Sequence, residues 1–61
     1  MTETYEMWLQ LMHAGYAFAE SNGDHFWVTP TGDARFAGEM DQPNTEEGAI
    51  DAAFLHWSHE T

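Results

Sequence analysis

A turn signal near the middle of the chain constrains the fold more than any other feature. Asn22 and Gly23 form a dipeptide that readily adopts the positive φ angles of a two-residue hairpin turn. The segments on either side, YAFAE (16–20) and HFWVT (25–29), alternate and are rich in aromatic residues, which is typical of strands. The sequence therefore predicts two antiparallel strands over 16–20 and 25–29. A lone hairpin is marginal in water, so this one needs a helix packed on it or a second copy of the chain.

The segment before the hairpin has the periodicity of a helix. Tyr5, Trp8, Leu9 and Met12 are spaced i, i+3, i+4 and i+7, which places them on one helical face, and Gly15 is suited to end the helix. We therefore predict a helix over residues 3–14 whose buried face carries these four residues.

The end of the chain repeats this pattern. Ile50, Ala53, Phe54 and Trp57 again follow i, i+3, i+4 and i+7, which predicts a second helix over about 45–58. Asn44 precedes Glu47 by three residues, the spacing of a capping box, with Asn in place of the usual Ser or Thr.

The segment between hairpin and last helix, TPTGDARFAGEM (29–40), is ambiguous. Thr29 as an N-cap followed by Pro30 favours a helix start, and a short helix would be lined by Ala34, Phe36, Ala37 and Met40. The alternative is a turn at 30–33 followed by a single helical turn. DQPN (41–44) is predicted to be a loop.

Together these elements predict one α+β domain over residues 1–61. It consists of an N-terminal helix, a β-hairpin, a short helix or turn, and a C-terminal helix packed on the sheet. A chain this short buries a modest fraction of its surface, so its stability margin is thin. A monomer and a homodimer both remain open.

Charge dominates the composition. The 61 residues carry eleven Asp and Glu against a single base, Arg35, for a formal net charge of −10. Self-repulsion at that density destabilises a compact state. A hydrophobic content of 43% nevertheless argues for a folded domain rather than a disordered one. Such a surface repels nucleic acid, so we expect no direct nucleic-acid binding and a basic protein as partner.

The residue inventory argues against catalysis, metal binding and membrane insertion. The chain has no Cys and no Lys, and it lacks a nucleophile–His–acid arrangement in recognisable context. His56, His59 and Glu60 have ligand spacing on a helix, but nothing else in sequence completes a metal site. No run approaches the ~18 apolar residues of a membrane span. We predict no enzyme activity, no cofactor, no metal and no membrane association, and we expect a soluble protein of the reducing cytoplasm.

The carboxylates form two candidate patches for a partner. Glu47 and Asp51 share a helix face about 6 Å apart, and such a row of negative charges suits a basic groove built for nucleic acid. The first patch runs along the chain from the loop into the last helix and comprises Glu39, Asp41, Glu46, Glu47 and Asp51. The second comprises Glu3, Glu6, Glu20 and Asp24.

Two other interpretations remain open. A binding module that meets its partner through exposed aromatics, such as an antitoxin-like or transcription-modulating protein, would depend on Trp27 or Tyr16 instead of on carboxylates. In a salt-adapted organism, or in a homodimeric structural protein, the charge would be incidental.

A short chain without Cys or Lys, with an aromatic core and the acidic stretches Glu3–Glu6 and Glu39–Asp51, resembles the phage-encoded DNA mimics, particularly small anti-CRISPR proteins. Within that class it is most similar to the acidic inhibitors of type I (Cascade) effectors, type I-C among them. The resemblance rests on size and charge and carries no diagnostic motif. It implies a non-enzymatic inhibitor in the cytoplasm of a bacterial host. By implication, the inhibitor would occupy the basic site where the effector's large subunit receives DNA.

Overall fold

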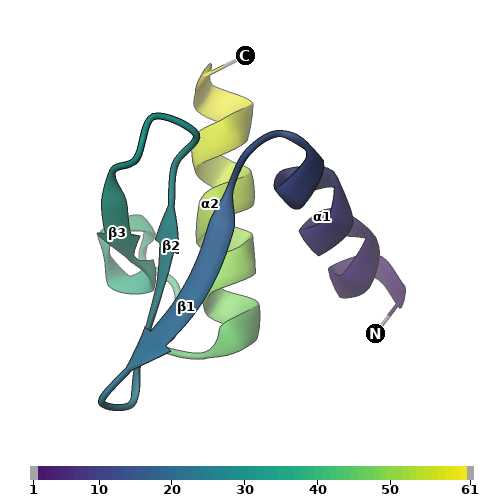
Figure 1. Ribbon diagram of the computed structural model, residues 1–61. Coiled ribbons are helices and arrows are strands. Elements are labelled where there is room, and N and C mark those ends of the chain that lie inside the picture. The colour runs from purple at the N-terminus through teal and green to yellow at the C-terminus, as the bar shows by residue number, and fades with distance from the viewer. Residues whose placement is uncertain (1, 61) are drawn as a thin grey trace.

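The computed structural model describes residues 2–60 as one small α+β domain (Figure 1). The predicted hairpin, its Asn-Gly turn and the two long helices are confirmed, each element within two residues of its expected bounds. The structure adds a third strand and places a 3-10 helix before the last helix. In chain order the elements are α1 (Thr2–His13), β1 (Ala17–Ser21), β2 (Asp24–Val28), β3 (Ala34–Phe36), η1 (Ala37–Met40) and α2 (Glu46–Glu60).

The sheet is antiparallel in the order β1-β2-β3. The two-residue turn at Asn22 and Gly23 has positive φ angles of 53° and 84°, as the dipeptide predicts. It sets a register in which Trp27 lies opposite Phe18 on one side and Arg35 on the other. Because paired residues share a face, Trp27 and Phe18 both point toward the core.

The third strand corrects the interpretation of residues 29–40. Thr29 does not begin a helix. Its hydroxyl accepts a hydrogen bond from the Asp33 backbone N–H at 3.0 Å, and its own N–H donates to the Asp33 carbonyl at 2.9 Å. With Gly32 at a φ of 96°, this turn reverses the chain and lays β3 against β2. The alternative, a turn followed by a single helical turn, describes the segment better, but it too omits β3.

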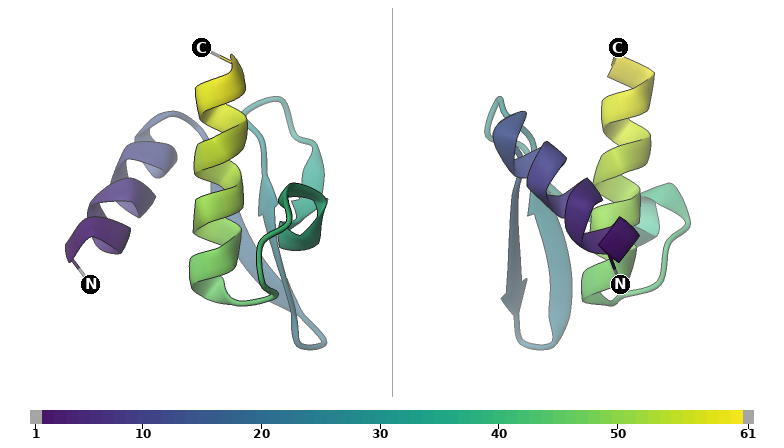
Figure 2. Two further views of the ribbon diagram at one scale, coloured as in Figure 1. Left: turned by 180° about the vertical axis from the view of Figure 1, so that it is seen from behind. Right: turned by 90° about the vertical axis from the view of Figure 1, so that its right-hand side faces the viewer.

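Helix α2 is the centre of the packing. It lies against one face of the sheet, with α1 on one side of it and η1 on the other, and no described helix covers the opposite sheet face (Figure 2). Small side chains on α2 allow these elements to approach closely. The buried hydrophobic residues are Leu11, Tyr16, Trp27, Ala37, Ala49, Ile50, Ala52 and Ala53.

The buried face of α1 differs from the predicted one. Leu11 is fully buried, whereas Tyr5 is 59% and Met12 is 42% exposed. Apolar residues occur on more than one face of this helix, so two overlapping i, i+3, i+4 patterns compete. The pattern through Met7 and Leu11 packs against the core, and it shares only Trp8 with the predicted face.

The predicted face of α2 is correct, with Ile50 and Ala53 buried and Phe54 and Trp57 partly buried against the core. Its predicted cap is wrong. The Thr45 hydroxyl accepts a hydrogen bond from the Gly48 N–H at 2.9 Å, so Thr45 caps the helix in place of Asn44.

Candidate functional site: an acidic end and its groove

Six of the predicted carboxylates gather where three elements begin or turn. The hairpin turn, the N-terminus of α2 and the N-terminus of α1 all lie toward the same end of the molecule (Figures 1 and 2). We call this the acidic end and define it by Glu3, Glu6, Glu20, Asp24, Glu46 and Glu47, all of which are exposed. The structure therefore joins part of the first predicted patch to the whole of the second.

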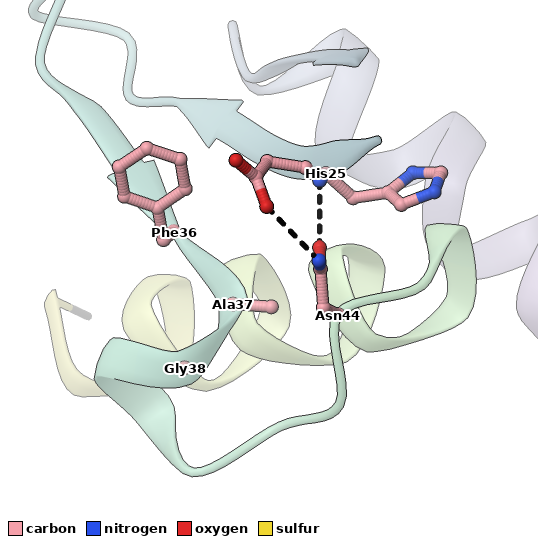
Figure 3. Close-up of a pocket in the computed structure, with 6 residues that line it drawn as sticks. His25, Phe36, Ala37, Gly38 and Asn44 are labelled. Atoms are coloured by element: carbon pink, nitrogen blue, oxygen red, sulfur yellow. Dashed lines mark hydrogen bonds between the residues drawn. The ribbon is translucent and has the colours of Figure 1, made fainter. Parts of the chain in front are cut away.

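Asn44 fixes the hairpin to the start of α2. Its Oδ1 accepts a hydrogen bond from the His25 backbone N–H at 2.7 Å, and its Nδ2 donates to Asp24 Oδ1 at 3.2 Å (Figure 3). The same Nδ2 also donates to the Gly23 carbonyl at 3.3 Å. Figure 3 shows this amide at the edge of a shallow pocket that is also lined by Phe36, Ala37 and Gly38. One side chain thus holds Asp24 beside the first turn of α2.

Glu46 and Glu47 occupy the first turn of α2 and lie beside different neighbours. Glu46 lines a cleft against the sheet together with Glu20, Phe18 and His25. It also lines, with Glu47, a groove between the two helices. Carboxylates at a helix N-terminus are stabilised by the helix dipole, which compensates locally for placing two of them side by side.

The groove between α1 and α2 combines these carboxylates with aromatic rings. We call it the aromatic–acid groove; its volume is about 410 Å³ and it is lined by Thr4, Tyr5, Trp8, Glu46, Glu47 and Ile50. The rings of Tyr5 and Trp8 stack, with centroids 5.9 Å apart and an interplanar angle of 27°. Tyr5 was expected to be buried because its spacing fits the apolar pattern of α1, and it lies at the surface instead.

The remaining predicted carboxylates lie elsewhere. Asp51 is exposed one turn beyond Glu47 on α2. Glu39 belongs to η1, and Asp41 ends it in a left-handed conformation with a φ of 60°. Because η1 lies on the opposite side of α2 from α1 (Figure 2), these two are separated from the aromatic–acid groove by the helix.

Few of these charges have a cationic neighbour. Arg35 Nη1 lies 3.7 Å from Glu39 Oε1, so the chain's single strong base is engaged away from the acidic end. His25 Nε2 lies 4.0 Å from Glu20 Oε2. Within residues 2–60, no ion pair involves the other predicted carboxylates: Glu3, Glu6, Asp24, Asp41, Glu46, Glu47 and Asp51. The acidic end therefore presents charge that a cation from outside can neutralise.

The aromatic alternative is wrong in the residues it named. Tyr16 and Trp27 are 3% and 1% exposed, and both form the core contact around His56. The Tyr16 hydroxyl is hydrogen-bonded to His56 Nδ1 at 2.8 Å, and the Trp27 and His56 rings lie 5.2 Å apart. His56 is thus a partly buried residue that packs against two core side chains. Among the described residues, no three His, Asp or Glu side chains are grouped for a metal ion.

Comparisons with models of protein families, with curated proteins and with solved structures found no match. None of the helices in the described part of the chain is long and apolar enough to cross a membrane.

Proposed function

We propose that this protein is a non-enzymatic inhibitor that mimics the negative charge of nucleic acid and occupies the nucleic-acid-binding site of a basic protein. The observation that carries the proposal is the negative charge of the acidic end, whose carboxylates form no ion pair with Arg among the described residues. Carboxylates from three separate segments converge there, while Arg35 pairs with Glu39 in another part of the surface.

The cost of this arrangement supports the proposal. Solubility alone is served equally well by mixed charges, which stabilise helices through Glu–Lys pairs instead of repelling one another. Here Glu46 and Glu47 are neighbours in the first turn of α2, and Glu46 also lines a cleft with Glu20; neither Glu46 nor Glu47 forms an ion pair among the described residues. A basic groove would relieve that repulsion on binding, because opposite charges then replace like ones.

A DNA-binding groove is the favoured partner surface. Such a groove presents rows of Lys and Arg to a regular series of phosphates. The carboxylates of the acidic end carry the same negative charge as those phosphates. The resemblance to acidic anti-CRISPR proteins makes the large subunit of a type I (Cascade) effector, type I-C included, the first partner to examine. Inhibition would be stoichiometric, fast in low salt and weakened by high salt.

The proposal is tested by the binding of labelled duplex target to a purified type I effector in the presence of this protein. We expect wild type to abolish DNA binding and Glu46→Gln/Glu47→Gln to need about tenfold more protein, equal to about 1.4 kcal/mol. The control is Glu39→Gln/Asp41→Asn, which removes the same number of charges from the segment on the other side of α2 and also breaks the Arg35–Glu39 ion pair. An equal loss of inhibition in the two double variants would show that inhibition depends on net charge and not on the acidic end. Undiminished DNA binding with wild type would exclude this effector as the partner.

A further inference from the structure

We infer that the aromatic–acid groove receives one arginine side chain of the basic partner, stacked on Tyr5 and Trp8 with its guanidinium toward Glu46 and Glu47. The inference rests on the proposed function for the nature of the partner. It adds a specific residue type and a specific subsite to what is otherwise a diffuse attraction between charged surfaces.

The aromatic pair is an observation independent of the charge. Tyr5 is 59% exposed although its spacing suits a buried face, and its ring stacks on Trp8, which lines the same groove. An exposed aromatic face attracts cations through the negative potential above the ring. The two carboxylates on the facing helix attract the same kind of ligand. Both walls of one groove therefore favour a cation.

Arginine fits these walls better than lysine. A guanidinium is planar and weakly hydrated, so it stacks on a ring while its five N–H donors point outward in the plane. Glu46 and Glu47 both line the groove, and the planar fork of five donors can pair with carboxylates while the guanidinium stays stacked on a ring, which an ammonium does not do. The apolar stem of the arginine would pass over Ile50, which forms part of the same lining.

The other exposed aromatic of comparable size offers no such combination. Phe36 is 53% exposed and packs edge-on against Phe26, its partner in the β2–β3 register, with ring centroids 6.0 Å apart. Its pocket contains one carboxylate, Asp24, which is hydrogen-bonded to Asn44. Phe36 is thus a matched control for Tyr5, and Asp41 is a matched control for Glu47.

The test uses a short peptide of alternating Arg and Gly and its Lys-for-Arg counterpart, added to the whole protein in about 0.15 M NaCl. Binding is followed by the NMR signals of the three tryptophan indole N–H groups. We expect saturable shifts of Trp8, an unchanged buried Trp27, and about fivefold tighter binding of the Arg peptide. Tyr5→Leu should remove that preference, and Tyr5→Phe should keep it.

The controls separate the groove from general attraction. Phe36→Leu and Asp41→Asn should leave both affinities within about twofold, whereas Glu47→Gln should weaken both peptides. Equal affinity of the two peptides for wild type, or equal effects of Tyr5→Leu and Phe36→Leu, would overturn the groove assignment. Those results leave the proposed inhibition intact if the effector assay still responds to Glu46→Gln/Glu47→Gln. Conversely, an Arg preference without competition against duplex DNA would retain the groove and reject nucleic-acid mimicry.

Discussion

Replacing Asn44 by Ala should detach the hairpin from the start of α2. The change removes three hydrogen bonds, of 2.7, 3.3 and 3.2 Å, that link this amide to His25, Gly23 and Asp24. A hydrogen bond contributes about 0.5–1.5 kcal/mol net, and these are exposed bonds that water partly replaces. We therefore expect a loss of about 1–2 kcal/mol in the free energy of unfolding. For a domain of this size that lowers Tm by about 4–16 °C.

The stability of Asn44→Asp should depend on salt in a way that the stability of Asn44→Ala does not. Asn44→Asp retains the acceptor for the His25 N–H but loses both donated bonds and places a carboxylate against Asp24. Its deficit should therefore shrink in high salt, because salt screens the new repulsion, whereas the deficit of Asn44→Ala should not. Gln42→Ala is the control, since that amide makes one local bond, from its Nε2 to the Met40 carbonyl at 3.3 Å.

Thermal and urea unfolding followed by circular dichroism measure all three variants. An Asn44→Ala protein within about 0.3 kcal/mol of wild type would refute the role of this amide in holding the acidic end together. So would a Gln42→Ala loss as large as that of Asn44→Ala.

Three further predictions concern the core and the charge. Gly48→Ala should destabilise α2 because the new Cβ would clash with the Pro43 carbonyl, even though Ala normally stabilises a helix relative to Gly by about 1 kcal/mol. Gly38→Ala has open space around its Cβ and should leave the free energy of unfolding nearly unchanged in the same urea titration. Trp27→Ala should lower the free energy of unfolding by about 3–5 kcal/mol and leave little folded protein by circular dichroism. Trp27→Phe should lower it much less, because it keeps an aromatic ring and removes an indole N–H that is buried without a hydrogen-bond partner among the described residues. Adding NaCl to about 1 M should raise Tm by several degrees, since a formal charge of −10 repels itself in the folded state; a Tm that does not rise would show that this repulsion is negligible.

Local signals predicted the elements that depend on local chemistry. Asn22 and Gly23 specify the turn because few other residues accept its positive φ angles. The i, i+3, i+4, i+7 spacing from Ile50 to Trp57 predicts part of the buried face of α2, because these residues lie on one side of the helix; Ala49 and Ala52, which extend that face, were not predicted.

Features that depend on distant partners were not predictable in the same way. β3 is three residues long, too short for alternation to be recognised, and it forms because the Thr29 turn brings it to Val28 and Phe26. Asn44 looked like a cap because of its distance from Glu47, but its partners lie about twenty positions earlier in the chain.

The sequence likewise predicts some features of the candidate site, and others depend on contacts between distant segments. The sequence indicates an acidic surface, since eleven acids face one base. It does not indicate which acids converge, because that depends on how three chain segments meet. Nor does it place Tyr5 at the groove, since the choice between two apolar faces of α1 is made by packing against α2.

The most direct measurement of the central claim is capture of a partner on this protein from nuclease-treated bacterial lysate, with elution by added duplex DNA at constant ionic strength. Nucleic-acid mimicry predicts that a basic nucleic-acid-binding protein or complex is retained by wild type, is released by DNA, and is retained poorly by Glu46→Gln/Glu47→Gln. A partner that stays bound in excess DNA and in high salt, with equal retention by both proteins, would contradict the claim.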